Sequence, residues 1–169
     1  GQQVGYRTLT IADWYAGIAH ASLWTGSAAS WIDLHPARAS SSQADGVRDG
    51  QQVGNVRVDG VVRASLWTGS AASWVDLHPV GVTYSHAIDT DGGQQVGWAS
   101  VGGNFHASLW SGSAASWVDL HPAGATISQA YGVNGGQQVG NATVIVAGGQ
   151  WHASLWSGSA ASWVNLHAF

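Results

Sequence analysis

The stretch GQQVGWASVGGNFHASLWSGSAASWVDLHP, residues 93–122, decides the fold of this chain, because close copies of both of its halves occur four times. Copies of GQQVG begin at Gly1, Gly50, Gly93 and Gly136, and copies of ASLW begin at Ala21, Ala64, Ala107 and Ala153. Successive ASLW copies are 43, 43 and 46 residues apart. Self-similarity with this period is typical of propellers, solenoids and repeat arrays.

Each repeat contains four segments with the character of short strands. ASLW and SW(V/I)DLH are rich in β-branched and aromatic residues and flank the small, polar GSAA, which predicts an antiparallel hairpin. GQQVG is the third strand, and the fourth precedes it in SQADGV, SHAIDT and SQAYGV. The turns between these two strands are Asp49-Gly50, Asp91-Gly92-Gly93 and Asn134-Gly135-Gly136, and such residues favour the positive φ of tight hairpins. Four antiparallel strands in about 43 residues predict one propeller blade.

We therefore predict an all-β fold, a β-propeller of about four four-stranded antiparallel blades in a single domain over residues 1–169. The approximate repeats are 1–36, 37–79, 80–122 and 123–169. Glu, Lys and Met are absent, which removes most strong helix formers. The first copy has no strand before GQQVG and the last has none after DLH, so we expect fifteen strands. Either one blade is a strand short, with residues 6–20 as a substitute strand, or a homo-oligomer completes the ring.

The repeated residues have predicted structural roles. Paired tryptophans should fill the space between blades, because neither face of the hairpin is polar; these are Trp24, Trp31, Trp67, Trp74, Trp110, Trp117, Trp156 and Trp163. At the end of the last strand, Asp33, Asp76 and Asp119, with Asn165 in the fourth copy, should accept backbone N–H groups. The glycines of GQQVG should permit a tight turn before the strand and close backbone approach after it. Its glutamines should bond to backbone groups of the same or an adjacent blade.

The pattern A(Y)GVNGGQQVG, HASLW and W(V)DL resembles the bacterial extracellular HAF-type repeats, and the resemblance covers all four copies. His20, His106 and His152 match the His of that family, whereas Arg63 replaces it in the second copy. Serines stand where the family prefers Phe, namely Ser22, Ser65, Ser108 and Ser154. The resemblance implies a propeller-like repeat protein that is secreted or displayed on the cell surface, and it implies no catalytic residue.

The sequence offers little support for catalysis. His35, His78, His121 and His167 lie on different repeats, and we expect each to lack the close His or Cys partner that zinc sites show. No nucleophile elbow, HExxH, phosphate-binding loop or cysteine cluster occurs. We therefore predict no catalytic residue, metal site or cofactor. A net charge of -4 with five dispersed Arg argues against nucleic acid as a partner. No apolar run reaches the roughly 18 residues of a membrane helix.

Any binding function should reside where the copies differ, because loops on a rigid scaffold carry specificity. The variable segments contain the candidate ligand-binding residues Trp14, Tyr15, Trp98, Phe105 and Trp151. Our first hypothesis is a non-catalytic structural or interaction module, and the second is a multivalent carbohydrate-binding propeller whose aromatic rings stack on sugars. The partner is an unknown protein or a glycan. The absence of Met and the start at Gly1 indicate a processed product or a piece of a longer chain, and the near-identity of the copies also fits recent amplification or deliberate construction.

Overall fold

The computed structural model describes residues 1–12, 18–144 and 150–167, which form four antiparallel sheets in chain order. Sheet 1 has three strands, and sheets 2, 3 and 4 have four each. Sheet 1 contains β1 (Gln3–Arg7), β2 (His20–Trp24) and β3 (Ile32–Asp33). Sheet 2 contains β4 (Ser41–Arg48), β5 (Gln51–Val58), β6 (Val61–Trp67) and β7 (Val75–Asp76). Sheet 3 contains β8 (Ser85–Asp91), β9 (Gln94–Val101), β10 (Asn104–Trp110) and β11 (Val118–Asp119). Sheet 4 contains β12 (Ala125–Asn134), β13 (Gln137–Val144), β14 (Gln150–Trp156) and β15 (Val164–Asn165).

These strands confirm the all-β class, and those described number fifteen, as predicted. The turns into GQQVG are also as predicted. Asp49 and Gly50, between β4 and β5, have φ of 50° and 80°, and Gly92-Gly93 and Gly135-Gly136 have positive φ in the corresponding turns. Positive φ at both central residues matches the twist of the flanking strands, which explains the glycine before each Gln-Gln.

The hairpin that follows ASLW differs from its prediction. Its last strand has only two residues, and the preceding Ala-Ala-Ser forms a 3₁₀ turn. These turns are η1 (Ala28–Ser30), η2 (Ala71–Ser73), η3 (Ala114–Ser116) and η5 (Ala160–Ser162). Ser30 Oγ donates to Ser27 O at 2.7 Å and accepts the Thr25 N–H at 2.7 Å, and both bonds recur in the other copies. A side chain that bonds its own backbone competes with the strand ladder, so pairing begins only after the tryptophan.

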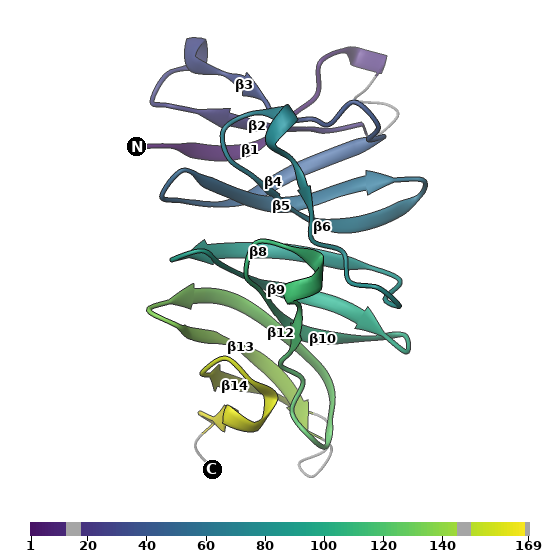
Figure 1. Cartoon of the computed structure of the whole chain (residues 1–169), viewed down its shortest axis with the longest axis vertical. Coiled ribbons are helices and arrows are strands. Elements are labelled where there is room, and N and C mark those ends of the chain that lie inside the picture. Colours follow the sequence, from purple (N-terminus) through teal and green to yellow (C-terminus); the bar gives the residue numbers. More distant parts are fainter. Residues whose placement is uncertain (13–17, 145–149, 168–169) are drawn as a thin grey trace.

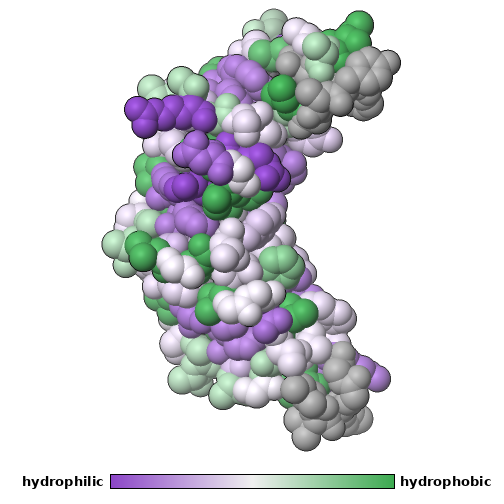
Figure 2. All heavy atoms as spheres, turned by 90° about the vertical axis from the view of Figure 1, so that its right-hand side faces the viewer, coloured by the Kyte–Doolittle hydropathy of each residue, from purple (hydrophilic) through white to green (hydrophobic). Residues whose placement is uncertain are grey.

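The four sheets stack on one another along the long axis of the molecule, with sheet 1 and sheet 4 at its opposite ends (Figure 1). The first strand of each of sheets 2 to 4 lies against the preceding sheet: β4 contacts β1 and β2, β8 contacts β5 and β6, and β12 contacts β9 and β10. Figure 2 shows that the stack bends into an arc. Each internal sheet is therefore covered on both faces.

Consecutive sheets meet at a joint of constant composition. One sheet supplies a Val, an Ala and two Leu, and the next supplies an Ala and a Trp pair. At the joint between sheets 2 and 3 these are Val53, Ala64, Leu66, Leu77, Ala87, Trp110 and Trp117. The other joints repeat this set with small variations. Trp67, Trp110 and Trp156 are 0% exposed, so the first tryptophan of each pair fills the joint in sheets 2 to 4.

The second tryptophan of each pair is half-buried and bonded within its own sheet. The indole Nε1 of Trp74 donates to Ser65 Oγ at 3.0 Å, and the same bond recurs in every sheet. This serine is the second residue of ASLW, and its hydroxyl has the same indole partner in all four copies.

The glutamines of GQQVG form a polar ladder along the stack. Gln52 Nε2 donates to Gly50 O at 2.9 Å, and its Oε1 accepts the Gly69 N–H at 2.7 Å. The same Nε2 lies 3.3 Å from Gln2 Oε1 of sheet 1. Sheets 3 and 4 repeat the ladder, from Gln95 to Gln51 and from Gln138 to Gln94. These fully buried amides thus bond to backbone groups of their own sheet and to an amide of the preceding one.

Candidate functional site

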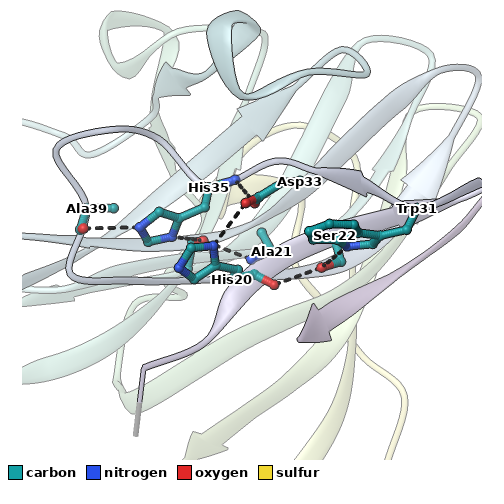
Figure 3. Close-up of polar contacts among 8 residues, drawn as sticks. His20, Ala21, Ser22, Trp31, Asp33, His35 and Ala39 are labelled. Carbon is teal, nitrogen blue, oxygen red and sulfur yellow. Dashed lines mark hydrogen bonds and ion pairs between the residues drawn. The ribbon is translucent and has the colours of Figure 1, made fainter. Parts of the chain in front are cut away.

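A polar cluster of His, Asp and Ser lies at the joint between consecutive sheets and is shown for sheet 1 in Figure 3. Asp33 Oδ2 accepts the Nδ1–H of His20 at 3.0 Å, and its Oδ1 accepts the backbone N–H of His35 at 2.8 Å. The rings of His20 and His35 stack with centroids 3.8 Å apart. His35 Nδ1 lies 2.8 Å from the hydroxyl of Ser42, which belongs to β4 of sheet 2. The cluster therefore ties two sheets together.

The hydrogen-bond partners fix the position of the hydrogen on His35. Ala39 O can only accept, so His35 Nε2 carries the hydrogen and donates to it at 3.1 Å. In the neutral ring Nδ1 is then the acceptor, so the hydroxyl of Ser42 donates to it while Ser42 Oγ accepts the backbone N–H of Ala21 at 2.9 Å. His35 is thus held as the neutral Nε2–H tautomer. Burial lowers its pKa, and the neighbouring His20 lowers it further.

The same link recurs at the next two joints. His78 Nδ1 lies 2.7 Å from Ser85 Oγ, and His121 Nδ1 lies 2.8 Å from Ser128 Oγ. Each of these serines accepts the backbone N–H of the ASLW alanine of the preceding sheet. Burial also lowers the pKa of His78 and His121. Each histidine therefore belongs to the contact between two sheets.

The partner of the aspartate varies between copies in a chemically consistent way. In sheet 2, Arg63 donates to Asp76 Oδ2 at 2.8 Å, in the place of the histidine. In sheet 4 the aspartate is replaced by Asn165, whose Nδ2 lies 2.8 Å from His152 Nδ1. An amide can donate where a carboxylate can only accept, so His152 Nδ1 becomes the acceptor. The side chains at positions 152 and 165 therefore stay hydrogen-bonded although the fourth copy has no negatively charged aspartate.

The cluster differs from a catalytic triad in two respects. The ring nitrogen of His35 that faces away from the serine bonds to a backbone carbonyl, whereas a triad requires a carboxylate there. The serine hydroxyl is also inaccessible, because Ser42 is 1% exposed and Ser85 and Ser128 are 0% exposed. Its chemistry is that of a buried hydrogen-bond link.

The expectation that these histidines lack a close His partner is wrong for His35 and His121, whereas in the second copy Arg63 stands in the place of the stacked histidine. His20 with His35, and His106 with His121, are stacked at 3.8 Å. The β2–β3 register pairs Ser22 with Asp33. Continued by two residues along each strand, the same antiparallel register places His20 opposite His35, and this pairing was the available signal. The two Nδ1 atoms of each stack bond instead to an aspartate and a serine. Within residues 1–12, 18–144 and 150–167, no group of three or more His, Cys, Asp or Glu side chains is placed to hold a metal ion.

A second cluster, here called the aromatic cluster, consists of Tyr84, His86, Trp98, Phe105 and Tyr131. Trp98 on β9 is its centre, with the His86 ring at 5.0 Å, the Tyr131 ring at 6.0 Å and the Phe105 ring at 6.4 Å. Tyr131 comes from β12, so the cluster bridges sheets 3 and 4. Sequence reasoning missed Tyr84, His86 and Tyr131, because they lie on or immediately before the first strands of their sheets and not in the variable segments.

The five candidate binding residues do not form one site. Trp98 and Phe105 lie in the aromatic cluster, where Trp98 is half-buried and Phe105 is 38% exposed. Trp151 on β14 is 50% exposed, and no ring contact within the described part of the chain joins it to that cluster. Trp14 and Tyr15 lie outside the described residues.

Two surface hollows lie elsewhere. One, of about 430 Å³, is lined by His35, Pro36 and Trp74 among others, between sheets 1 and 2. The other, of about 320 Å³, is lined by Arg48, Asp89 and Val139 among others. Neither hollow is lined by one of the candidate aromatic residues.

Comparison of the chain with models of protein families, with curated proteins and with solved structures finds no match. No helix in the three described ranges has the length and hydropathy needed to cross a lipid bilayer. The geometry of the two clusters is therefore the basis for a functional conclusion.

Acid is expected to destabilise the fold through the three half-buried histidines that bond to serines at the joints. An unfolded His has a pKa of about 6.5, and burial lowers the pKa of His35, His78 and His121 in the folded chain. Below about pH 6.5 the unfolded state therefore binds more protons, and the free energy of unfolding decreases as pH falls. Urea unfolding between pH 7.5 and about 5 measures this slope.

The test variant for this measurement is His121→Gln, which should reduce the slope because it removes one half-buried titrating group. Val80→Ala, at a position that is 99% exposed and carries no titrating group, is the control and should leave the slope unchanged. A stability that rises as the pH is lowered would contradict the assignment of neutral, half-buried imidazoles.

Proposed function

We propose that the chain is a non-catalytic module of β-propeller type that serves as a structural and interaction scaffold. The observation that carries the proposal is that the repeated Ser, His and Asp side chains serve as hydrogen-bond links. They bond one sheet to the next and leave no accessible nucleophile in the cluster. The resemblance to HAF-type repeats supports the same architecture and an extracellular location.

The variable segments are the proposed contact surface. Several of their side chains are exposed, among them Tyr6, Phe105 and Trp151. The repeated side chains hold the stack, so these positions can change without loss of a joint. A protein partner is the first candidate, because the exposed side chains are spread over different sheets and do not converge on one pocket.

A glycan is the second candidate, and the aromatic cluster favours it. Tyr131 is 44% exposed and its hydroxyl donates to Gln129 Oε1 at 2.7 Å, so an aromatic face lies beside polar groups. Aromatic faces flanked by hydrogen-bonding groups suit sugar rings. Weak sites on several sheets would then combine by avidity.

One set of assays distinguishes these functions. For a scaffold, a panel of hydrolase substrates with and without added metal should show no turnover, and Ser128→Ala should lower the unfolding temperature. Turnover that disappears in folded Ser128→Ala would overturn the proposal.

A glycan array tests the carbohydrate-binding function. Binding that is lost in Trp98→Ala and Trp151→Ala but kept in Val80→Ala would favour it, where Val80 is 99% exposed and serves as the control.

A further inference from the structure

Sheet 4 exposes the apolar set that the other sheets bury. We call Val139, Ala153, Leu155 and Leu166 the tail face. Val139 is 47% exposed and Leu166 is 53% exposed, whereas their counterparts in sheet 3, Val96 and Leu120, are 0% exposed. Ala153 is exposed and its counterpart Ala107 is 0% exposed. The tail face is therefore one half of a joint without its other half.

Sheet 1 carries the complementary half. We call Gln3, Gly5, Trp24 and Trp31 the head face. Trp24 is the counterpart of the fully buried Trp67, Trp110 and Trp156, yet it remains half-buried. A side chain added at Gly5 would contact only the Trp24 ring, at 3.7 Å, whereas one added at Gly54 would collide with the backbone of Gln43 on β4. The difference arises because, among the described residues, no strand pairs with the outer edge of β1.

The glutamine ladder ends at the same two faces. At each internal joint, the second Gln of one sheet donates to the first Gln of the preceding sheet. Gln137 of sheet 4 is exposed and would be the next acceptor, and Gln3 of sheet 1 is exposed and would be the next donor. Polar and apolar halves of the joint thus match at opposite ends of the chain.

We propose that copies of this chain associate head to tail, with the Trp24 and Trp31 of one copy packed on the tail face of the next. Sheets 1 and 4 of one copy lie at opposite ends of the stack (Figure 1), so the joint forms between copies. Its constituents are those of the three internal joints, except that the described part of sheet 1 contains no counterpart of β4 and its alanine. The contact is heterologous, since two different surfaces meet. Because this contact involves fewer groups than an internal joint, we expect it to be weak, so that the fraction of assembled chains rises with protein concentration.

The test is sedimentation velocity on the 169-residue chain over a wide range of concentration. Wild type should sediment as multiples of 17.4 kDa. Val139→Asp, in the tail face, should be monomeric. The control is Val164→Asp: Val164 is also 47% exposed, but its counterparts Ile32, Val75 and Val118 are 37–39% exposed in every sheet, so no joint covers that position.

Mixing distinguishes this contact from a symmetric one. Gly5→Asp places a carboxylate on the head face and should also be monomeric alone. In a mixture of the two variants, Gly5→Asp keeps an intact tail face and Val139→Asp keeps an intact head face. One molecule of each can therefore associate, and the mixture should form dimers and nothing larger. Near-ultraviolet circular dichroism checks that each variant is folded, and Ala153→Arg is a second tail variant.

Each of the following results would overturn the proposal: a monomeric wild type at all concentrations, assembly that survives in Val139→Asp, or assembly of Gly5→Asp alone. The last would show two tail faces packed together. Loss of assembly in the Val164→Asp control would equally count against it, because that side chain lies outside both faces.

Discussion

Trp110→Ala is expected to lower the free energy of unfolding by about 3–5 kcal/mol, the usual cost of removing a large aromatic side chain from a core. Trp110 is 0% exposed and packs at the joint between sheets 2 and 3 with Val53 and Leu66. Its indole Nε1 has no hydrogen-bond partner among the described residues, so the loss reflects packing. Urea unfolding followed by far-ultraviolet circular dichroism measures it.

The control for this prediction is Trp151→Ala, which removes the same side chain from a position that is 50% exposed. Its cost should be about 1 kcal/mol or less, the range of most surface changes. Equal losses in the two variants would show that Trp110 does not fill the joint.

Gly97→Ala is expected to cost about 1–3 kcal/mol or more, because a Cβ at this position meets backbone that must move. The added atom would collide with the carbonyl oxygen of His86 on the adjacent strand β8. Gly5 occupies the same place in the first copy, where an added Cβ makes only an ordinary contact with the Trp24 ring. Gly5→Ala should therefore be nearly neutral.

A thermal or urea unfolding comparison of Gly97→Ala with Gly5→Ala gives the result directly. Both variants alter the last glycine of a GQQVG motif, so intrinsic strand propensity cancels. A larger loss in Gly5→Ala would contradict the close approach of β8 to β9.

The features that sequence predicted are those fixed by local chemistry. Asp49-Gly50 requires positive φ, and the turn has it. Gly97 permits close backbone approach, and β8 lies there. Trp110 belongs to a hairpin without a polar face, and it is buried. Each of these follows from one residue type at one position of the repeat.

The features that sequence missed depend on contacts between elements. The stacking of His20 on His35 requires the β2–β3 register together with a chain reversal. The aromatic cluster requires Tyr131 from the following sheet. The 3₁₀ turns depend on a Ser30 hydroxyl that bonds its own backbone. Periodicity identifies a repeat, but it does not report how one repeat lies on the next.

Because the substantial contacts link only consecutive sheets, the stack behaves as a one-dimensional array of nearest-neighbour units. In such an array the end units have one stabilising neighbour and the middle units have two. Local opening should therefore begin at the termini, and amide hydrogens of β5 and β9 should exchange with solvent more slowly than those of β1 and β14.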